Sequence, residues 1–330
     1  MRNFLRLVIC FAAMQVHAGE PDTGAIVRGH IMPGYQALAE ETGALAKTAL
    51  AHCGAHHPEL IAAFHDAFDA WVRVSHLRFG PSEQKDRAFA LAFWPDPRGS
   101  GPKAIADLIA TRDRVVDDAG SFATVSIAAR GFYALEHLLF DPQVLAGGAA
   151  GYRCALVKSV TTDISRNAAA ILKDWQSGYG YLMSAPGNDT YRTSAEATRQ
   201  LFTALTTGLE FTSQTRLGRP MGSFDRPRPG RAEARRSARS LRHVILSLNA
   251  TKELALLMAE DEGEMTRAFD AAILRAETLK DPVLAGVADP QARLRIEVLQ
   301  QSIDDIRQLL ALQVGPALGI SPGFNALDGD

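Results

Sequence analysis

One apolar stretch, ARGFYALEHLLF at residues 129–140, contains three side chains that can bind a ligand or exchange a proton: Tyr133, Glu136 and His137. Successive residues of an α-helix are about 100° apart. Glu136 therefore shares a stripe with the apolar Phe132, and the other two side chains form the adjoining stripe. A buried carboxylate is costly unless it is paired, hydrogen-bonded or bound to a metal. We therefore expect Glu136 to meet a partner from another part of the chain.

Ordinary structural roles are also open to these side chains. Glu136 could pair with an arginine or accept hydrogen bonds from hydroxyl groups. Tyr133 could be a packed aromatic residue with one acceptor, and His137 could lie at the edge of the helix. Gly131 leaves the backbone open where a side chain would otherwise stand. The identity of the partner of Glu136 distinguishes these structural roles from a role in ligand binding.

A second set of candidate ligands lies in the amphipathic stretch 58–77. His65 and Asp69 are one helical turn apart, so they could bind a ligand together. Asp69 could equally pair with Arg73, four residues further on. His76 lies on the same stripe, close to the end of this expected helix.

The segment 216–242 contains nine arginines. Guanidinium groups form paired hydrogen bonds with carboxylates and phosphates, so one use of the segment is to bind an anionic ligand such as a carboxylate-bearing chelate. The other use is to pair with the chain's own acidic side chains, Glu136 among them. An expected helix over 231–259 would present Glu233 and Ser237 on one face. No histidine or aspartate at a diagnostic spacing supports a nucleophilic serine there.

Helical periodicity recurs along the chain, and the alternating β-branched runs that predict strands are nearly absent. The sequence therefore predicts an all-α protein. The expected helices cover residues 24–52, 58–77, 101–110, 121–139, 149–177, 191–214, 231–259, 262–278 and 289–313.

Proline and glycine separate these helices, and the sequence SAPGND at 184–189 is the best candidate for a domain boundary. We expect an N-terminal helical bundle over 24–183 that carries the 129–140 stretch. A linker over 184–190 would join it to a C-terminal helical bundle over 191–326.

The first 18 residues have the features of a secretory signal peptide. A basic start precedes an apolar run too short to span a bilayer, and small residues precede a cleavage site after Ala18. No later segment is a convincing transmembrane span. The net charge of −2 selects no polyanionic partner, and nucleic acid is not expected.

Two cysteines remain after the expected cleavage, Cys53 and Cys154. An exported protein meets an oxidising compartment, and two cysteines allow only one intramolecular bridge. We expect that disulfide to form. Two separate buried thiols are the alternative.

The stretch GFYALEHLLF resembles the signature of the imelysin-like family, a glycine followed two residues on by histidine and three further on by glutamate. Here these positions hold Gly131, Tyr133 and Glu136. The segments AFDAW, HLRFGP, FWPDP and RLGRPMGSFDRPRPGRAEARRSARS extend the resemblance along nearly the whole exported chain.

The resemblance implies a bacterial protein of the periplasm or cell envelope that is linked to iron uptake. It implies two domains of the four-helix-bundle type, with the functional site in the cleft between them. On this basis a metal ion or an iron-related ligand is the expected occupant. The expected ligand-binding residues are Tyr133, Glu136, His76, Arg219, Glu233 and Ser237.

Tyr133 stands where the family signature has histidine, and this changes the expected chemistry. A zinc hydrolase normally needs three protein ligands and an open position, which tyrosine and glutamate do not supply in the usual way. Phenolate and carboxylate oxygens suit a hard cation such as ferric iron better. Candidate metal ligands are Glu136, Tyr133 and His76, for iron or another divalent or trivalent metal.

No catalytic residue is expected on these grounds. Two other functions remain open, a metal-dependent peptidase and a non-catalytic partner of an envelope iron-transport complex.

Overall fold

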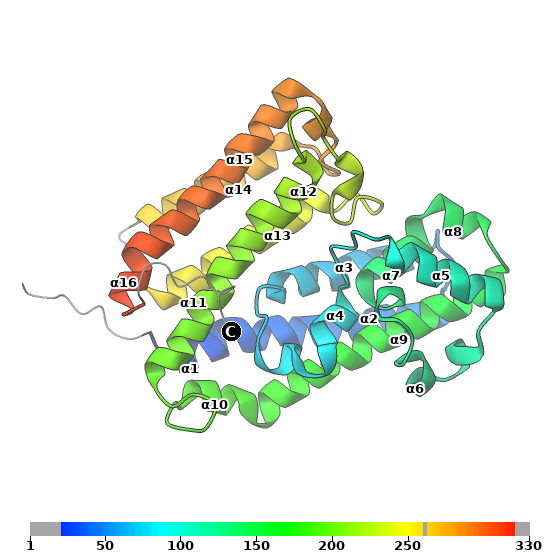
Figure 1. The fold of residues 1–330 in the computed structure, drawn as a ribbon. Helices are drawn as coiled ribbons and strands as arrows, with labels where there is room; N and C mark the ends of the chain where they lie inside the picture. The colour runs from blue at the N-terminus through cyan, green and yellow to red at the C-terminus, as the bar shows by residue number, and fades with distance from the viewer. Residues whose placement is uncertain (1–20, 260–262, 321–330) are drawn as a thin grey trace, which may run out of the picture.

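The computed structural model describes residues 21–259 and 263–320, which form two groups of helices (Figure 1). The expected signal peptide, residues 1–18, lies outside the described residues. Within them no β-strand occurs, and the one isolated bridge joins Ser223 to Arg226. The expected all-α fold is confirmed.

The first group comes from the N-terminal half of the chain. Its long helix α2 (Met32–Ala51) packs against both α3 (Pro58–Val74) and α9 (Ala150–Asp174). The shorter helices of this group are α1 (Thr23–Ile26), α4 (Arg87–Leu91), α5 (Ser100–Thr111), α6 (Ala119–Phe122), α7 (Gly131–Phe140), α8 (Pro142–Ala146) and α10 (Gly180–Ser184).

The second group lies at the upper left of Figure 1. In it α13 packs against α11 and α14, and α14 packs against α15. Because α13 also packs against α3 of the first group, the two groups share a boundary. The helices of this group are α11 (Ser194–Glu210), α12 (Gly218–Met221), α13 (Ser240–Met258), α14 (Glu264–Leu279), α15 (Pro290–Leu309) and α16 (Gly315–Ala317).

Aromatic packing on α3 fixes how that boundary is built. Its apolar face buries Phe64, Phe68 and Trp71, as the helical period of these residues predicts. The ring of Phe68 stacks on that of Phe132 in α7, with centroids 4.7 Å apart. The same ring meets His243 of α13 edge-on at 4.5 Å. One side chain thus joins α3 both to the helix of the 129–140 stretch and to the second group.

The predicted helix over 121–139 is wrong in its extent. Helix α6 ends at Phe122, and α7 begins only at Gly131. Gly131 has a φ of +75°, and Arg130 before it is extended. The chain therefore turns sharply into α7, which no continuous helix could do.

The predicted helix over 231–259 is also wrong, because α13 begins at Ser240. Residues 232–239 have no regular secondary structure, and we refer to them as the 232–239 loop. Ala234 and Ala238 have φ angles of +45° and +57°, a conformation that costs an L-residue about 1–2 kcal/mol. Contacts with other parts of the molecule must therefore hold this loop.

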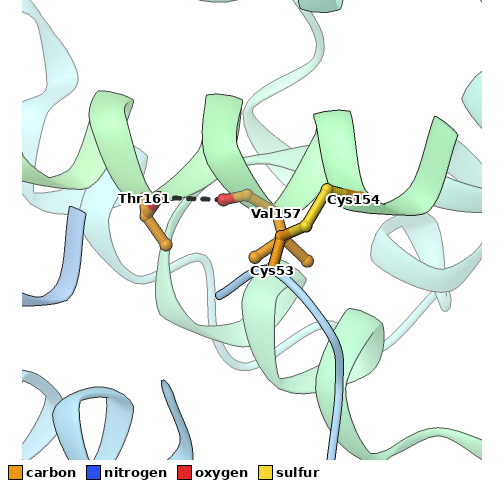
Figure 2. Close-up of a disulfide and its surroundings, with 4 residues drawn as sticks. All are labelled: Cys53, Cys154, Val157 and Thr161. Carbon is orange, nitrogen blue, oxygen red and sulfur yellow. Dashed lines mark hydrogen bonds between the residues drawn. A yellow bond between two sulfur atoms is a disulfide. The ribbon is translucent and has the colours of Figure 1, made fainter. Parts of the chain in front are cut away.

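The expected disulfide is confirmed. Cys53, just after α2, is bonded to Cys154 in the first turns of α9, with Cα atoms 5.0 Å apart (Figure 2). Further along α9 the Thr161 hydroxyl donates to the Val157 carbonyl at 2.9 Å. Over the ranges that the structure describes, no helix is both long and apolar enough to cross a membrane.

Candidate ligand-binding site

Glu136 is buried, with 2% of its surface exposed. Its Oε1 accepts hydrogen bonds from the backbone N–H of Ser237 at 2.9 Å and from the Ser237 hydroxyl at 2.8 Å. The expected partner from another part of the chain is thus the 232–239 loop, and it is a hydrogen-bond donor and not an arginine. Hydrogen bonds of this kind offset the cost of burying a carboxylate.

Tyr133 lies one turn before Glu136 and contacts the same loop. Its hydroxyl donates to Glu233 Oε1 at 2.5 Å. The other oxygen of Glu233 accepts from Arg216 Nε at 2.7 Å. His243 Nδ1 lies 3.2 Å from that oxygen, without hydrogen-bond alignment. Glu233 is therefore the centre of a buried polar cluster.

The charges of this cluster follow from its surroundings. Burial alone would raise the pKa of Glu233, but the Arg216 charge and the contacts with His243 and Tyr133 outweigh it and lower this pKa to about 2. Burial, followed by the negative charge of Glu233, raises the pKa of Tyr133 well above its ordinary value. Tyr133 is therefore a neutral phenol that donates a hydrogen bond to an ionised Glu233.

Two cavities adjoin this cluster. The first, which we name the arginine cavity, has a volume of about 310 Å³, and both Tyr133 and Glu136 line it. Its wall also contains Trp94, Asp96, His137, Arg219, Arg231 and Arg236. The second, the histidine cavity, has a volume of about 380 Å³ and is lined by residues that include His76, Tyr133, Arg216 and Glu233. Tyr133 and Trp94 line both cavities.

Positive charge dominates the arginine cavity. Arg219 Nε is buried without a hydrogen-bond partner, and its guanidinium lies 5.9 Å from the ring centroid of Trp94. Burial, and then the charge of Arg231, lower the pKa of Arg219. Arg236 is already paired, because its Nε donates to Asp141 at 2.8 Å. Arg219 thus lines this cavity and has a buried nitrogen that lacks a hydrogen-bond acceptor.

The acidic side chains of the arginine cavity are largely occupied. Asp96 accepts from the backbone N–H groups of Ser100 and Gly101, at 2.9 and 2.7 Å. One oxygen of Glu136 is held by Ser237, as described above. The cavity therefore suits a ligand that carries negative charge on oxygen atoms.

The three candidate metal ligands do not form a ready set in the structure. Tyr133 is a neutral donor to Glu233. His76 lines the histidine cavity, and its Nε2 lies 3.1 Å from His30 Nε2. Burial, then His30 and Arg216, lower the pKa of His76 well below its ordinary value. Each side chain already has another partner, so these residues do not fit a bare metal ion as they stand. Their role as metal ligands stays a prediction.

His65 and Asp69 do not act as a pair. Asp69 binds Arg239 through one oxygen and Arg242 through the other, the latter at 2.6 Å. Both arginines come from the second group. The alternative prediction, that Asp69 pairs with Arg73, is therefore wrong. His65 stacks on Phe140, with ring centroids 6.0 Å apart.

Of the expected ligand-binding residues, the structure joins Tyr133 to Glu233 and Glu136 to Ser237 by hydrogen bonds, and it places Arg219 in the wall of the arginine cavity. His76 lies in the other cavity. The sequence does not identify Arg216 or His243 as a site residue, because both act through Glu233 and their spacing along the chain carries no signal.

Comparison with known proteins supports the resemblance seen in the sequence. The profile of the Imelysin family matches residues 31–310. The fold is similar to that of an imelysin-like protein from Psychrobacter arcticum 273-4, with a TM-score of 0.78, 20% sequence identity, and coverage of 92% of this chain and 96% of that chain.

A second solved structure is described as an iron-regulated protein A precursor from Parabacteroides distasonis ATCC 8503. It has a TM-score of 0.71 and 14% identity, with 90% of this chain and 92% of that chain covered. Curated protein sequences give no significant match.

Proposed function

The chain belongs to the imelysin family, and on that premise we propose that it binds an anionic, iron-related ligand in the arginine cavity. A ferric chelate that bears carboxylate groups has the required chemistry. Binding of this ligand would serve iron uptake in the periplasm or envelope of a bacterium. The similarity to a protein described as iron-regulated supports the link to iron.

The observation that carries this proposal is the buried, unpartnered Nε of Arg219 in the cavity wall. A buried donor without an acceptor costs about 1–3 kcal/mol, which a ligand carboxylate would recover. The planar guanidinium presents paired donors that match a carboxylate. Arg231 lines the same cavity and adds positive charge.

Glu136 and Tyr133 have a different part in the proposal. They line the same wall and present oxygen atoms, which suit a hard cation such as ferric iron. A chelated ion needs fewer ligands from the protein than a bare ion does. The absence of a complete set of metal ligands at these residues is therefore compatible with a chelate as the occupant.

The proposed location rests on two further features. Residues 1–18 have the composition of a signal peptide, and the Cys53–Cys154 disulfide is of the kind that persists in an oxidising compartment. Both fit an exported protein.

The test is a titration of the purified chain with ferric citrate, followed by the quenching of tryptophan fluorescence, since Trp94 lines the cavity. Arg219→Gln should weaken binding by about 2–5 kcal/mol, or roughly 30-fold or more, because a desolvated charge pair is lost. Glu136→Gln should weaken the binding of ferric citrate more than the binding of iron-free citrate.

Arg235→Gln is the matched control, because Arg235 belongs to the same arginine-rich segment but is exposed and does not line the cavity. Its affinity should equal that of the wild type. Equal affinity in the Arg219 variant would refute the proposal. Equal binding of citrate with and without iron would remove its iron-related part.

A further inference from the structure

A second cluster of ligand-type side chains lies far from the 129–140 stretch in sequence, where α2 is joined to α3. His52 directly follows α2, His57 directly precedes α3, and Glu59 lies in the first turn of α3. One ligand atom of each lies within 4.8 Å of those of the other two. Among residues 21–259 and 263–320, no other group of three histidine, cysteine or acidic residues meets that condition.

The geometry within this cluster is close. The two imidazole rings stack with their centroids 3.9 Å apart and their planes within 8°. His52 Nε2 lies 3.5 Å from Glu59 Oε2. His57 Nδ1 is buried and has no hydrogen-bond partner. A metal ion lies in the plane of each imidazole that binds it, so the stacked rings would have to rotate about their side-chain bonds to bind one ion together.

The backbone that carries these side chains is already held in place. Cys53, next to His52, is covalently bonded to Cys154 of α9 (Figure 2). The His57 N–H donates to the Gly54 carbonyl at 2.9 Å, which closes the turn between the two histidines. A loop fixed in this way loses little conformational entropy when its side chains take a ligand.

We propose that His52, His57 and Glu59 bind one divalent transition-metal ion, for which Zn²⁺ is the best match. Two imidazole nitrogens and one carboxylate oxygen are a ligand set that zinc prefers, and three protein ligands leave a fourth position for water. None of the three residues lines the arginine or the histidine cavity. This site is therefore separate from the proposed chelate site.

The experiment is isothermal titration of the full chain, purified without a polyhistidine tag, with ZnCl₂ at neutral pH. We expect one ion per chain. His52→Ala and His57→Ala should each weaken binding at least about tenfold, because the loss even of an outer-shell partner costs about 10–100-fold. A titration with Co²⁺, monitored by the visible absorption of the bound ion, reports on the same site because this absorption depends on the metal ligands.

His56→Ala is the matched control, because His56 lies on the same turn, is exposed and is not a member of the cluster. It should bind Zn²⁺ as the wild type does. Unchanged affinity in the His52 and His57 variants, or no binding by the wild type, would overturn the proposal. Circular dichroism of each variant verifies that it is folded.

Discussion

Glu233 contacts three polar side chains that come from both groups of helices: Tyr133 of α7, Arg216 beside α12 and His243 of α13. Its side chain is 3% exposed, as is that of Arg216. Removal of one partner of a buried ion pair leaves the other charge uncompensated, which is strongly destabilising. Glu233 thus stabilises the wall between the two cavities, while Glu136 and Arg219 face the proposed ligand.

We expect Glu233→Gln to lower the free energy of unfolding at pH 7 by about 3–5 kcal/mol, because Arg216 keeps its buried charge and loses its counterion. Urea denaturation measures the change. Glu210→Gln is the control, since Glu210 and Arg307 form a similar pair whose side chains are 41% and 30% exposed. It should cost less than about 1 kcal/mol. Equal losses in the two variants would contradict the assigned role of Glu233.

The same carboxyl predicts a dependence of stability on pH. Its pKa falls from the ordinary value of 4.5 to about 2 on folding. The unfolded chain therefore binds the proton more readily, and the stabilisation is complete above about pH 5 and is lost as the pH falls from 4.5 towards 2. The shift corresponds to roughly 3 kcal/mol. Stability measured across this range should fall less steeply in Glu233→Gln than in the wild type.

At the scale of elements, the entry into α7 positions both Tyr133 and Glu136. Gly131 begins this helix with a φ of +75°. A Cβ atom at this position would lie 2.2 Å from the Leu91 carbonyl oxygen and 2.4 Å from that of Ala90. Glycine is therefore required here both by backbone conformation and by the close approach of α4.

We expect Gly131→Ala to destabilise the protein by about 3 kcal/mol or more, since strain from the left-handed conformation adds to a clash with backbone that cannot move freely. Thermal and urea unfolding measure this loss. Gly43→Ala, in the middle of α2, is the matched control because an added Cβ meets nothing within 4 Å. That change should stabilise by up to about 1 kcal/mol. A tolerated alanine at 131 would show that α7 can begin in another way.

The 232–239 loop is the second element that the site needs. It presents Ser237 to Glu136 and Glu233 to Tyr133 in spite of two alanines with positive φ. If the 232–239 loop were part of a regular helix, Ser237 and Glu233 would not make these contacts with α7. The contacts that hold the loop in place are those that build the site.

At the scale of the whole molecule, ion pairs as well as apolar packing join the two groups of helices. Asp69 of α3 binds Arg239 and Arg242, and Asp141 after α7 binds Arg236. We propose that the groups are two domains divided within 184–190, as the sequence predicts. The arginine-rich segment of the second would then reach across to the first.

The disulfide closes the long loop between α2 and α9, since its cysteines are 101 positions apart in the sequence. Chain-entropy arguments assign about 4–5 kcal/mol to a loop of that length, and measured values are typically 2–4 kcal/mol. We expect the Cys53→Ala/Cys154→Ala variant to lose about that amount in urea denaturation. A reducing agent should destabilise the wild type and leave the variant unchanged. No difference between the two proteins would show that helix packing alone holds α2 against α9.

The amino-acid sequence by itself determined the helical class, because apolar residues at helical spacing form a buried stripe whatever they pack against. It also determined the disulfide, since only two cysteines follow position 18, and the burial of Glu136, which lies on such a stripe. The helical class and the burial of Glu136 depend on residues within a few turns of one another. The disulfide depends only on the number of cysteines in the chain.

Only the tertiary structure decided which groups meet. Tyr133 and Glu233 are 100 residues apart, and Glu136 and Ser237 are 101 apart. The break before α13 went against the local helical pattern because long-range hydrogen bonds hold the 232–239 loop. The pairing of Asp69 with arginines of the second group likewise depends on how α3 and α13 pack. Local periodicity reports which face of a helix is buried, but it carries no information about the side chain that will lie opposite.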